Sequence, residues 1–552
     1  MKLFKRAATF CMAAAMALSL SVTAFAAGNG GDRTLTVTGV TLDNKKVFAV
    51  QMFDARVEGT GDNYTFDSYV LADEDWLTFF KDSTDAGVNL QDRDSDGDVD
   101  TDDASAYVES LRDQNLADFA NKAQAWVRSH SGNFNVLEVT ASDDRATFNN
   151  LKAGYYLVYP EGGSTSNDSR GTDAMLVNVP RDNNAEWNIK SVFPTVDKKV
   201  DTDNDGQNAA DNGSAQVGDV VTFTLTSAVP DMRDYTTFYF AFNDTLSNGL
   251  KVVDDNGQAV EDGTGITLDS LTVTIGGKSV TNGYTVNLSS NSLKIEFTDL
   301  KTATIQDGTI TTGAAIVVTY KAMITEAATT TNPANNEVKV EYSNDPSNTT
   351  HGTSTPDETD VYTYAIKVNK WATDAGGKEG NLAGAKFILS TSATAPTADE
   401  IAADYVGYTG IIKLIGSDNA YRVAKPDEAG AVTSFTTTAT GDITISGLEG
   451  STDPGTTYYL HEIEAPADYN KLKDPIEVKI TVTSLEDGTA TITVNGNTAT
   501  GDGNTTVDVE NKKGIELPET GSIGTIGLTV AGVAVVLAGV MLPRKKKNKE
   551  QE

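Results

Sequence analysis

The sequence has one cysteine, Cys11, among 552 residues, and three histidines, His130, His351 and His461. A single cysteine excludes an internal disulfide, so an extracellular fold of this chain needs another means of stabilisation. The histidines stand far apart in the sequence, and no nucleophile motif or phosphate-binding loop is present. A hydrolytic enzyme is therefore the least supported class of function.

Positive charge is also scarce, with 43 Lys and Arg residues against 78 Asp and Glu residues and a net charge of −35. Without the first 26 residues and the tail from Arg544, 35 cations face 76 anions, a net charge of −41. Such a surface repels nucleic acid and anionic membranes, and it favours solubility and cation binding. The sequence therefore predicts no nucleic-acid partner.

The amino terminus has the pattern of a secretory signal peptide. Three cations precede an apolar run over residues 7–20, and a small-residue cleavage site ends at Ala26. The apolar run is too short to span a membrane as a stable anchor. We expect residues 1–26, including Cys11, to be removed, which leaves a secreted chain without cysteine.

Most of the remaining chain alternates apolar and polar residues with a period of two. The pattern is clear over 219–226 and over 476–483, where a turn at Asp487-Gly488 leads to a second run over 491–494. Such runs joined by tight turns are typical of half-buried strands in β-sandwiches. Only residues 103–128 have apolar residues at helical spacing, so a helix is expected there.

The length requires about three domains. Polar or proline-containing junctions lie at Pro194-Thr195, at 343–360 and at Lys513-Gly514. We therefore predict a mainly β chain of tandem Ig-like sandwiches: a helix-containing first domain over 27–195, a middle domain over 196–357 and a third domain over 358–513. Residues 514–552 form a tail.

The tail combines a pentapeptide, an apolar span and a basic end. The pentapeptide is Leu517, Pro518, Glu519, Thr520 and Gly521. Residues 522–542 are 21 uncharged residues, long enough to cross a bilayer, and Arg544–Lys547 would stay cytoplasmic. The pentapeptide resembles the LPxTG signal that sortases cleave after the threonine, which predicts covalent attachment to peptidoglycan rather than an ordinary membrane anchor.

Several segments resemble the major pilins of Gram-positive, sortase-assembled pili, whose fimbrial domains form Lys–Asn isopeptide bonds. In the middle domain the matching segments are 196–200, 242–250 and 336–346. The resemblance implies Lys198 as nucleophile, Asp244 as catalytic acid and Asn344 as partner amide. Lys199 and Asn336 are the neighbouring alternatives.

In the third domain, residues 458–469 (YYLHEIEAPADY) resemble the E-box of CnaB-type modules, although Ile463 and Asp468 depart from the usual residues. The resemblance implies a second triad of Lys370, Glu462 and Asn511. Burial makes a lysine amine neutral and keeps a carboxyl group protonated, so one can attack an amide and the other can relay protons as ammonia leaves. Each domain would react once, and the chain is otherwise not an enzyme.

Polymerisation in this family uses a lysine at the end of the first domain. The matching segment here is 187–195 (WNIKSVFPT), in which Thr195 stands where the lysine is expected. Lys190 and Lys199 lie close to the junction and are the candidate acceptors. The resemblance implies as partners a pilin-class sortase, a housekeeping sortase and neighbouring pilin subunits. A singly displayed adhesin or a pilus-base subunit, binding a host protein or glycan, is the alternative.

An aspartate-rich loop before the expected helix has the spacing of an EF-hand. Its six acidic positions are Asp92, Asp94, Asp96, Asp98, Asp100 and Asp103, with Gly97 at the turn. Carboxylate oxygens at this spacing are the ligands that Ca²⁺ prefers, so we predict a calcium site. A second loop, 201–212, begins in the same way but has asparagine at two ligand positions. A polar turn without a bound ion is therefore an equally good interpretation of this loop.

Overall fold

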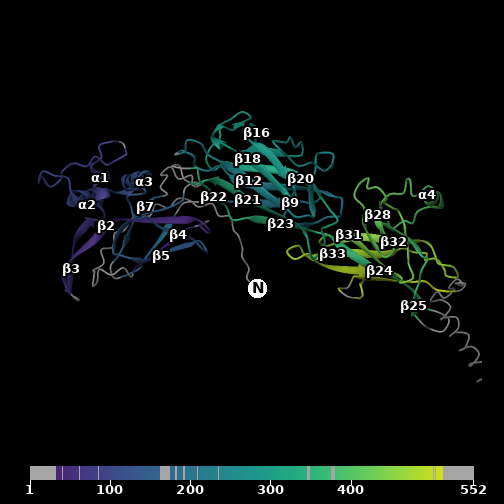
Figure 1. Cartoon of the computed structure of the whole chain (residues 1–552). Helices are drawn as coiled ribbons and strands as arrows, with labels where there is room; N and C mark the ends of the chain where they lie inside the picture. The colour runs from purple at the N-terminus through teal and green to yellow at the C-terminus, as the bar shows by residue number, and fades with distance from the viewer. Residues whose placement is uncertain are drawn as a thin grey trace, which may run out of the picture.

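The computed structural model describes residues 33–39, 42–60, 63–84, 86–161, 174–180, 183–189, 193–207, 209–233, 235–344, 349–373, 379–501, 503 and 505–513. The predicted signal peptide and the sorting tail lie outside these residues. Within the described ranges, no helix is both long enough and apolar enough to cross a membrane. The chain is mainly β, as predicted, and forms three domains in a row, with the helical domain at one end (Figure 1).

The first domain packs three helices on a sheet of order β3-β2-β6-β7, beside a smaller sheet of order β5-β1-β8. Its strands are β1 (Arg33–Gly39), β2 (Lys46–Thr60), β3 (Asn63–Leu71), β4 (Leu137–Thr140), β5 (Arg145–Leu151), β6 (Gly154–Pro160), β7 (Met175–Val179) and β8 (Ala185–Ile189). Its helices are α1 (Glu74–Lys81), α2 (Thr101–Ser110) and α3 (Asp113–Ser129). The predicted helix is present but broken between α2 and α3, and α1 is additional.

The helices of the first domain are attached by aromatic packing. Trp76 and Phe79 of α1 are fully buried, and Phe119 and Trp126 of α3 lie against Phe79 with ring centres 5.8 and 5.6 Å away. Aromatic side chains bury the largest apolar areas, so this cluster fixes the helical layer on the sheet.

The middle domain is a sandwich of a seven-stranded and an eight-stranded sheet. Its elements are β9 (Asp197–Asp201), β10 (Asn212–Ser214), β11 (Val220–Ala228), β12 (Phe240–Leu246), β13 (Leu250–Val252), β14 (Gly263–Thr264), β15 (Thr272–Ile275), β16 (Lys278–Asn282), β17 (Thr285–Ser289), β18 (Ser292–Phe297), η1 (Leu300–Thr302), β19 (Thr304–Ile305), β20 (Ala315–Ile324), β21 (Ala334–Ser343), β22 (His351–Thr353) and β23 (Asp357–Tyr362). Because β23 pairs with β21, the domain extends to residue 362 rather than to 357.

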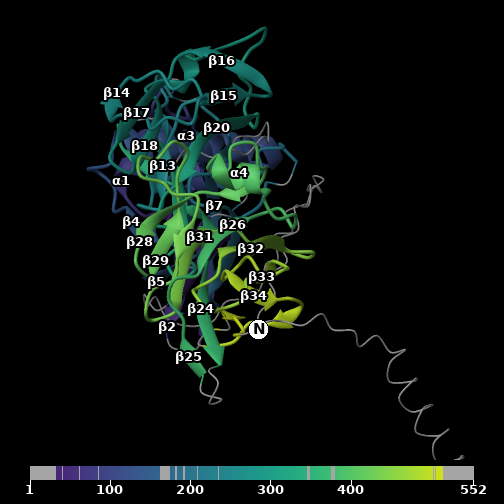
Figure 2. The same ribbon diagram turned by 90° about the vertical axis from the view of Figure 1, so that its right-hand side faces the viewer.

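The third domain is a second sandwich, with sheets of six and seven strands. Its elements are β24 (Tyr364–Thr373), β25 (Glu379–Asn381), β26 (Lys386–Ser390), α4 (Ala398–Ala402), β27 (Ile411–Ile412), β28 (Leu414–Ser417), β29 (Ala420–Val423), β30 (Phe435–Thr436), β31 (Asp442–Leu448), β32 (Thr456–Glu464), β33 (Ile476–Ser484), β34 (Thr489–Val494), β35 (Asn497–Thr498) and β36 (Thr506–Glu510). The view along the row of domains shows α4 at the edge of this sandwich (Figure 2).

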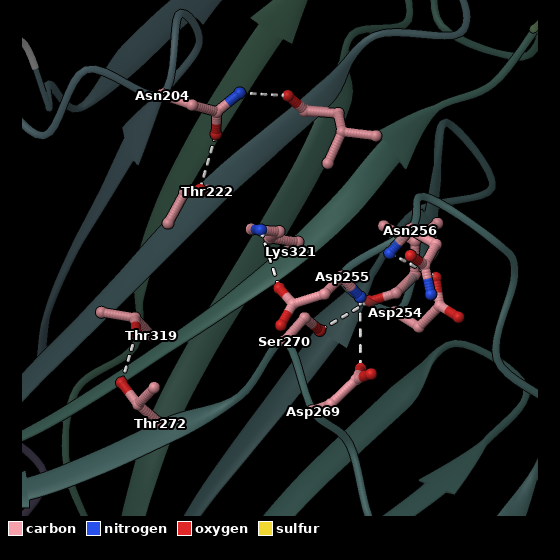
Figure 3. A network of polar contacts seen from close by, with 12 residues as sticks. Asn204, Thr222, Asp254, Asp255, Asn256, Asp269, Ser270, Thr272, Thr319 and Lys321 are labelled. Atoms are coloured by element: carbon pink, nitrogen blue, oxygen red, sulfur yellow. Dashed lines mark hydrogen bonds and ion pairs between the residues drawn. The ribbon is translucent and has the colours of Figure 1, made fainter.

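The predicted strands follow the period-two pattern. In β11, Val221, Phe223 and Leu225 are fully buried, and the threonines between them are half-buried. The outer face is polar: Thr272 and Thr319 hydrogen-bond across β15 and β20, and Lys321 pairs with Asp255 at 2.8 Å (Figure 3). One face of each sheet therefore forms the core and the other meets solvent.

Candidate cross-linking sites

In the middle domain, Lys198 and Asp244 meet between the two sheets. Lys198 Nζ lies 2.6 Å from Asp244 Oδ1, and both side chains are fully buried. Lys198 belongs to β9 and Asp244 to β12, so the pair joins opposite sheets. Burial lowers the pKa of Lys198, and the Asp244 carboxylate opposes this shift. The site therefore favours a neutral amine more than a surface position does.

A buried amide completes this cluster. Asn336 of β21 is fully buried, and its Nδ2 donates to Tyr320 Oη at 2.7 Å. The Tyr320 hydroxyl in turn donates to Asp244 Oδ2 at 2.6 Å. Asn336 Oδ1 is buried without a hydrogen-bond partner, which is a costly state for a carbonyl oxygen. The sequence analysis did not predict a role for Tyr320, because a tyrosine in a strand of alternating apolar and polar residues has the pattern of an ordinary core residue.

The prediction of Asn344 at this site is wrong. In the pairing of β12 with β21, Asp244 lies opposite Val338 and Asn336 lies opposite Leu246. Asn344 follows the end of β21 and is six residues beyond Val338, roughly 20 Å along a strand at about 3.3 Å per residue. Asn336 is therefore the amide that the register brings to Lys198 and Asp244.

Lys199, the alternative nucleophile, has a different environment. Its Nζ pairs with Asp211 and with Asp197, and its side chain is half-buried. These carboxylates raise the pKa of Lys199 despite an opposing effect of partial burial. Lys199 thus remains an ammonium ion outside the core, and Lys198 is the residue that points inward.

In the third domain, the structure brings Lys370, Glu462 and Asn511 together. All three are buried, with exposed fractions of 0, 4 and 1%. Lys370 lies on β24 beside the parallel strand β36, and its Nζ donates to Val509 O at 2.9 Å. Asn511 Nδ2 donates to Glu462 Oε2 at 3.0 Å. The first and last strands of the domain therefore meet at this cluster.

Two backbone groups hold the acid and the amide in place. The Leu472 amide donates to Glu462 Oε2 at 2.7 Å, and Asn511 Nδ2 also donates to Asn470 O at 2.7 Å. Glu462 Oε1 and Asn511 Oδ1 are buried without hydrogen-bond partners. As in the middle domain, an amide carbonyl is left unpaired next to an acid and a buried lysine. An amine, an amide and a proton relay are the components of transamidation.

Burial lowers the pKa of Lys370 to about 8, although Glu462 raises it. We expect an Asn511→Ala variant, in which Lys370 stays a free amine, to gain stability as pH rises from about 8 towards 10. In this range the unfolded chain binds the proton that the folded domain has already lost, so unfolding becomes less favourable. The gain should be on the order of 2 kcal/mol, measured by denaturant unfolding at several pH values.

The matched control is the double variant Lys370→Met with Asn511→Ala, which has no lysine at this position. Its stability should show no such rise between pH 8 and 10. An equal rise in both variants would contradict a lowered pKa of Lys370 as its cause.

Lys199, one of the two candidate polymerisation lysines, lies on β9 at the start of the middle domain. Lys190 lies outside the described residues. Thr195, in the position where the resemblance expects a lysine, is exposed, and its carbonyl accepts a hydrogen bond from Ser227 Oγ at 2.6 Å. Phe193 and Pro194 are buried, so the chain is fixed to the middle domain just before β9.

The first aspartate-rich loop gathers three of its six predicted ligands. Carboxylate oxygens of Asp92, Asp94 and Asp103 lie within 4.8 Å of one another. Asp100 instead caps α2 by accepting from the backbone of Asp103, and Asp98 pairs with Lys81 at 3.2 Å. Three clustered carboxylates fit the oxygen-rich environment that Ca²⁺ takes in proteins.

The second loop gathers Asp201, Asp203 and Asp205 in the same way. It is also tied to β11 by Asn204, whose Nδ2 donates to Val220 O and whose Oδ1 accepts from Thr222, both at 2.6 Å (Figure 3). This loop thus has a structural role as a turn, independent of any ion.

Comparison with protein families identifies two segments. Residues 509–552 match the LPXTG cell wall anchor motif. The chain is a cell-wall-anchored surface protein. Residues 364–498 match a prealbumin-like fold domain, SpaA, which covers most of the third domain. These two matches confirm the predicted resemblance to LPxTG pilins and make the chain a sortase substrate.

Among solved structures, the chain is similar to several major pilins. It is 18% identical to SpaD of Corynebacterium diphtheriae, with 89% of this chain and 98% of that chain covered and a TM-score of 0.40. It is 16% identical to the T6 backbone pilin of Streptococcus pyogenes, with 88 and 99% covered and a TM-score of 0.41. No curated protein matches the sequence.

Proposed function

We propose that this wall-anchored protein is the shaft subunit of a covalent surface pilus and that two internal Lys–Asn isopeptide bonds stabilise it. The observation that carries the proposal is the repeated buried cluster: Lys198, Asp244 and Asn336 in one domain, and a second such cluster around Lys370 in the next. Burying a lysine side chain costs free energy, so two buried lysines in similar clusters indicate a specific role. A chain without cysteine also has no disulfide bond that could stabilise it in place of an isopeptide bond.

The reaction is the same in both domains. The neutral lysine amine attacks the side-chain carbonyl carbon of the asparagine, and the carboxyl group takes up the amine proton and passes a proton to the departing nitrogen. Ammonia leaves and an amide remains. In the middle domain the bond joins the two sheets through β9 and β21. In the third domain it joins β24 to the residue after β36.

In the assembled pilus, a pilin-class sortase would cleave between Thr520 and Gly521 and transfer the acyl group to a lysine of the next subunit. A housekeeping sortase would transfer the last subunit to peptidoglycan. We assign adhesion to a host protein or glycan to the helix-containing first domain, which lies at one end of the row of domains (Figure 1). Display of single copies as an adhesin is the competing function.

A gel of boiled wall extracts in sodium dodecyl sulfate separates these two functions. Covalent polymers survive boiling, so a shaft subunit gives a ladder of bands that reacts with an antibody to this chain. A single band, with the chain present in the wall, would contradict the shaft role and support single display.

We further propose that the first aspartate-rich loop binds Ca²⁺ through Asp92, Asp94 and Asp103. A bound ion stabilises the folded state, by about 2.7 kcal/mol at one hundred times its dissociation constant. Chelation should therefore lower the melting temperature of the first domain, and added Ca²⁺ should restore it. An Asp92→Asn, Asp103→Asn double variant should no longer respond to chelation, whereas Asp98→Asn should respond like the wild type.

A further inference from the structure

A third lysine and a third acid are buried in the first domain. Lys45, in the turn before β2, is 2% exposed, and Glu161, immediately after β6, is 7% exposed. The two are held as neighbours because β2 pairs with β6: the Glu161 amide donates to Lys46 O at 2.8 Å, and the Lys46 amide donates to Glu161 Oε2 at 3.4 Å. Neither residue has a role in the two clusters described above.

An asparagine from the middle domain meets this pair. The side-chain amide of Asn344, which follows β21, hydrogen-bonds to the Glu161 carboxylate. Asn344 Oδ1 accepts a hydrogen bond from Thr350 Oγ1 at 2.8 Å. Lys45 Nζ donates to the carbonyl oxygen of Thr353 and lies 5.2 Å from the ring centre of Tyr342. The lysine, the acid and the amide thus converge at the end of β21.

Gly352 is the residue that lets these groups come together. It lies opposite Tyr342 in the pairing of β21 with β22. A Cβ atom at this position would lie 2.9 Å from Glu161 Oε1 and 3.3 Å from Asn344 Cβ. Any side chain here would push the acid or the amide away, so the close approach depends on glycine.

We propose that Lys45 and Asn344 form a third isopeptide bond, with Glu161 as the acid, and that this bond joins the first domain to the middle domain. The inference rests on the proposed function, since it assigns to a third site the chemistry of the other two. It differs from them in that its members come from two domains, so it locks an interface rather than closing a sandwich.

The environment prepares the groups for this step. Burial lowers the pKa of Lys45, an effect that Glu161 and Asp43 oppose, and burial raises the pKa of Glu161, which Lys45 opposes. Both shifts favour the neutral amine and the neutral acid over a buried ion pair. The Thr350 hydroxyl, by donating to Asn344 Oδ1, is placed to stabilise the oxyanion that forms on attack.

The step balances without a co-reactant. The nitrogen lone pair of Lys45 forms a bond to Asn344 Cγ, and the Cγ–Nδ2 bond breaks with its electron pair on Nδ2. Glu161 gives its proton to Nδ2, which leaves as ammonia, and regains a proton from the attacking amine. One amide replaces another, nothing is oxidised or reduced, and the chain becomes lighter by roughly 17 Da.

Peptide mapping by mass spectrometry of the full chain tests the proposal directly. A digest should contain a branched peptide that holds both Lys45 and Asn344 and is roughly 17 Da lighter than the sum of its two linear parts. The branched peptide should persist in Lys46→Ala and in Asn335→Ala, the matched controls. It should be absent from Asn344→Ala and strongly reduced in Glu161→Gln.

The same digest separates this inference from the proposed function. If branched peptides join Lys198 to Asn336 and Lys370 to Asn511 while Lys45 and Asn344 occur only in linear peptides, the third bond is overturned and the proposed function stands. If no branched peptide occurs at any of the three sites, both are overturned.

Discussion

Replacing Asn336 by alanine is expected to lower the melting temperature of the middle domain by roughly 10–20 °C. The bond from Lys198 to Asn336 would close a loop on the order of 140 residues, and a cross-link of that span contributes about 5 kcal/mol in the chain-entropy model. The loss of unfolding free energy is larger still because the variant keeps Lys198 and Asp244 buried but lacks the neighbouring Asn336 amide.

Asn335→Ala is the matched control for this experiment. Asn335 lies on the same strand but faces outward, where it hydrogen-bonds to Glu358 and Asp360. Its removal should shift the melting temperature by a few degrees at most, because surface substitutions usually cost less than about 0.5 kcal/mol. Calorimetry of both variants beside the wild type makes the comparison. Equal shifts in the two variants would show that Asn336 contributes packing only.

Replacing the acceptor lysine is expected to abolish the polymer completely. Among the two candidates we expect Lys190→Ala to remove the ladder from boiled wall extracts and Lys199→Ala to retain it. The Lys199 amine is engaged by two carboxylates that raise its pKa, which keeps it protonated and unable to attack an acyl-enzyme. Lys190 is the other lysine next to the junction in the sequence, and it then remains as the candidate acceptor.

The chain itself should still reach the wall in Lys190→Ala as a single band, since the housekeeping attachment depends only on the tail. Thr520→Ala serves as the opposite control: it removes the acyl donor, so the ladder and the wall-linked monomer are both lost. A ladder that disappears in Lys199→Ala and persists in Lys190→Ala would reverse the assignment.

Much of the fold could be predicted because apolar and polar residues alternate along the sequence of most strands. The buried triplet of β11 and the turn between β33 and β34 follow from residue order alone. The triad of the third domain could also be located, because its acid lies in a recognisable segment and its asparagine ends the last strand. Helix α1 was missed because it has only eight residues, and a short apolar run of that length cannot be told from a strand by its period alone.

The error over Asn344 has a specific physical origin. Asn336 and Asn344 are an even number of residues apart, so the alternation pattern of the sequence makes both candidates for the inward face, although β21 ends at Ser343. Only the register between β12 and β21, which pairs Asp244 with Val338, decides between them, and register depends on tertiary packing. The cluster of Lys45, Glu161 and Asn344 was hidden for a related reason, since its members come from two domains.

The arrangement of the domains in a row suggests a mechanical role for the proposed isopeptide bonds. The middle and third domains also meet through hydrogen bonds from Val217 N to Gly447 O and from Gly450 N to Ser214 Oγ, both at 3.0 Å. Such contacts can separate under load, whereas an amide bond cannot. Cross-links inside each sandwich would therefore keep the fold intact when a polymer of these subunits is stretched.

The central claim is that the two buried clusters react, and peptide mapping of the full chain tests it most directly. We expect one branched peptide that joins Lys198 to Asn336 and another that joins Lys370 to Asn511, each roughly 17 Da lighter than its two linear parts together. Recovery of all four residues in linear peptides of unshifted mass would contradict it.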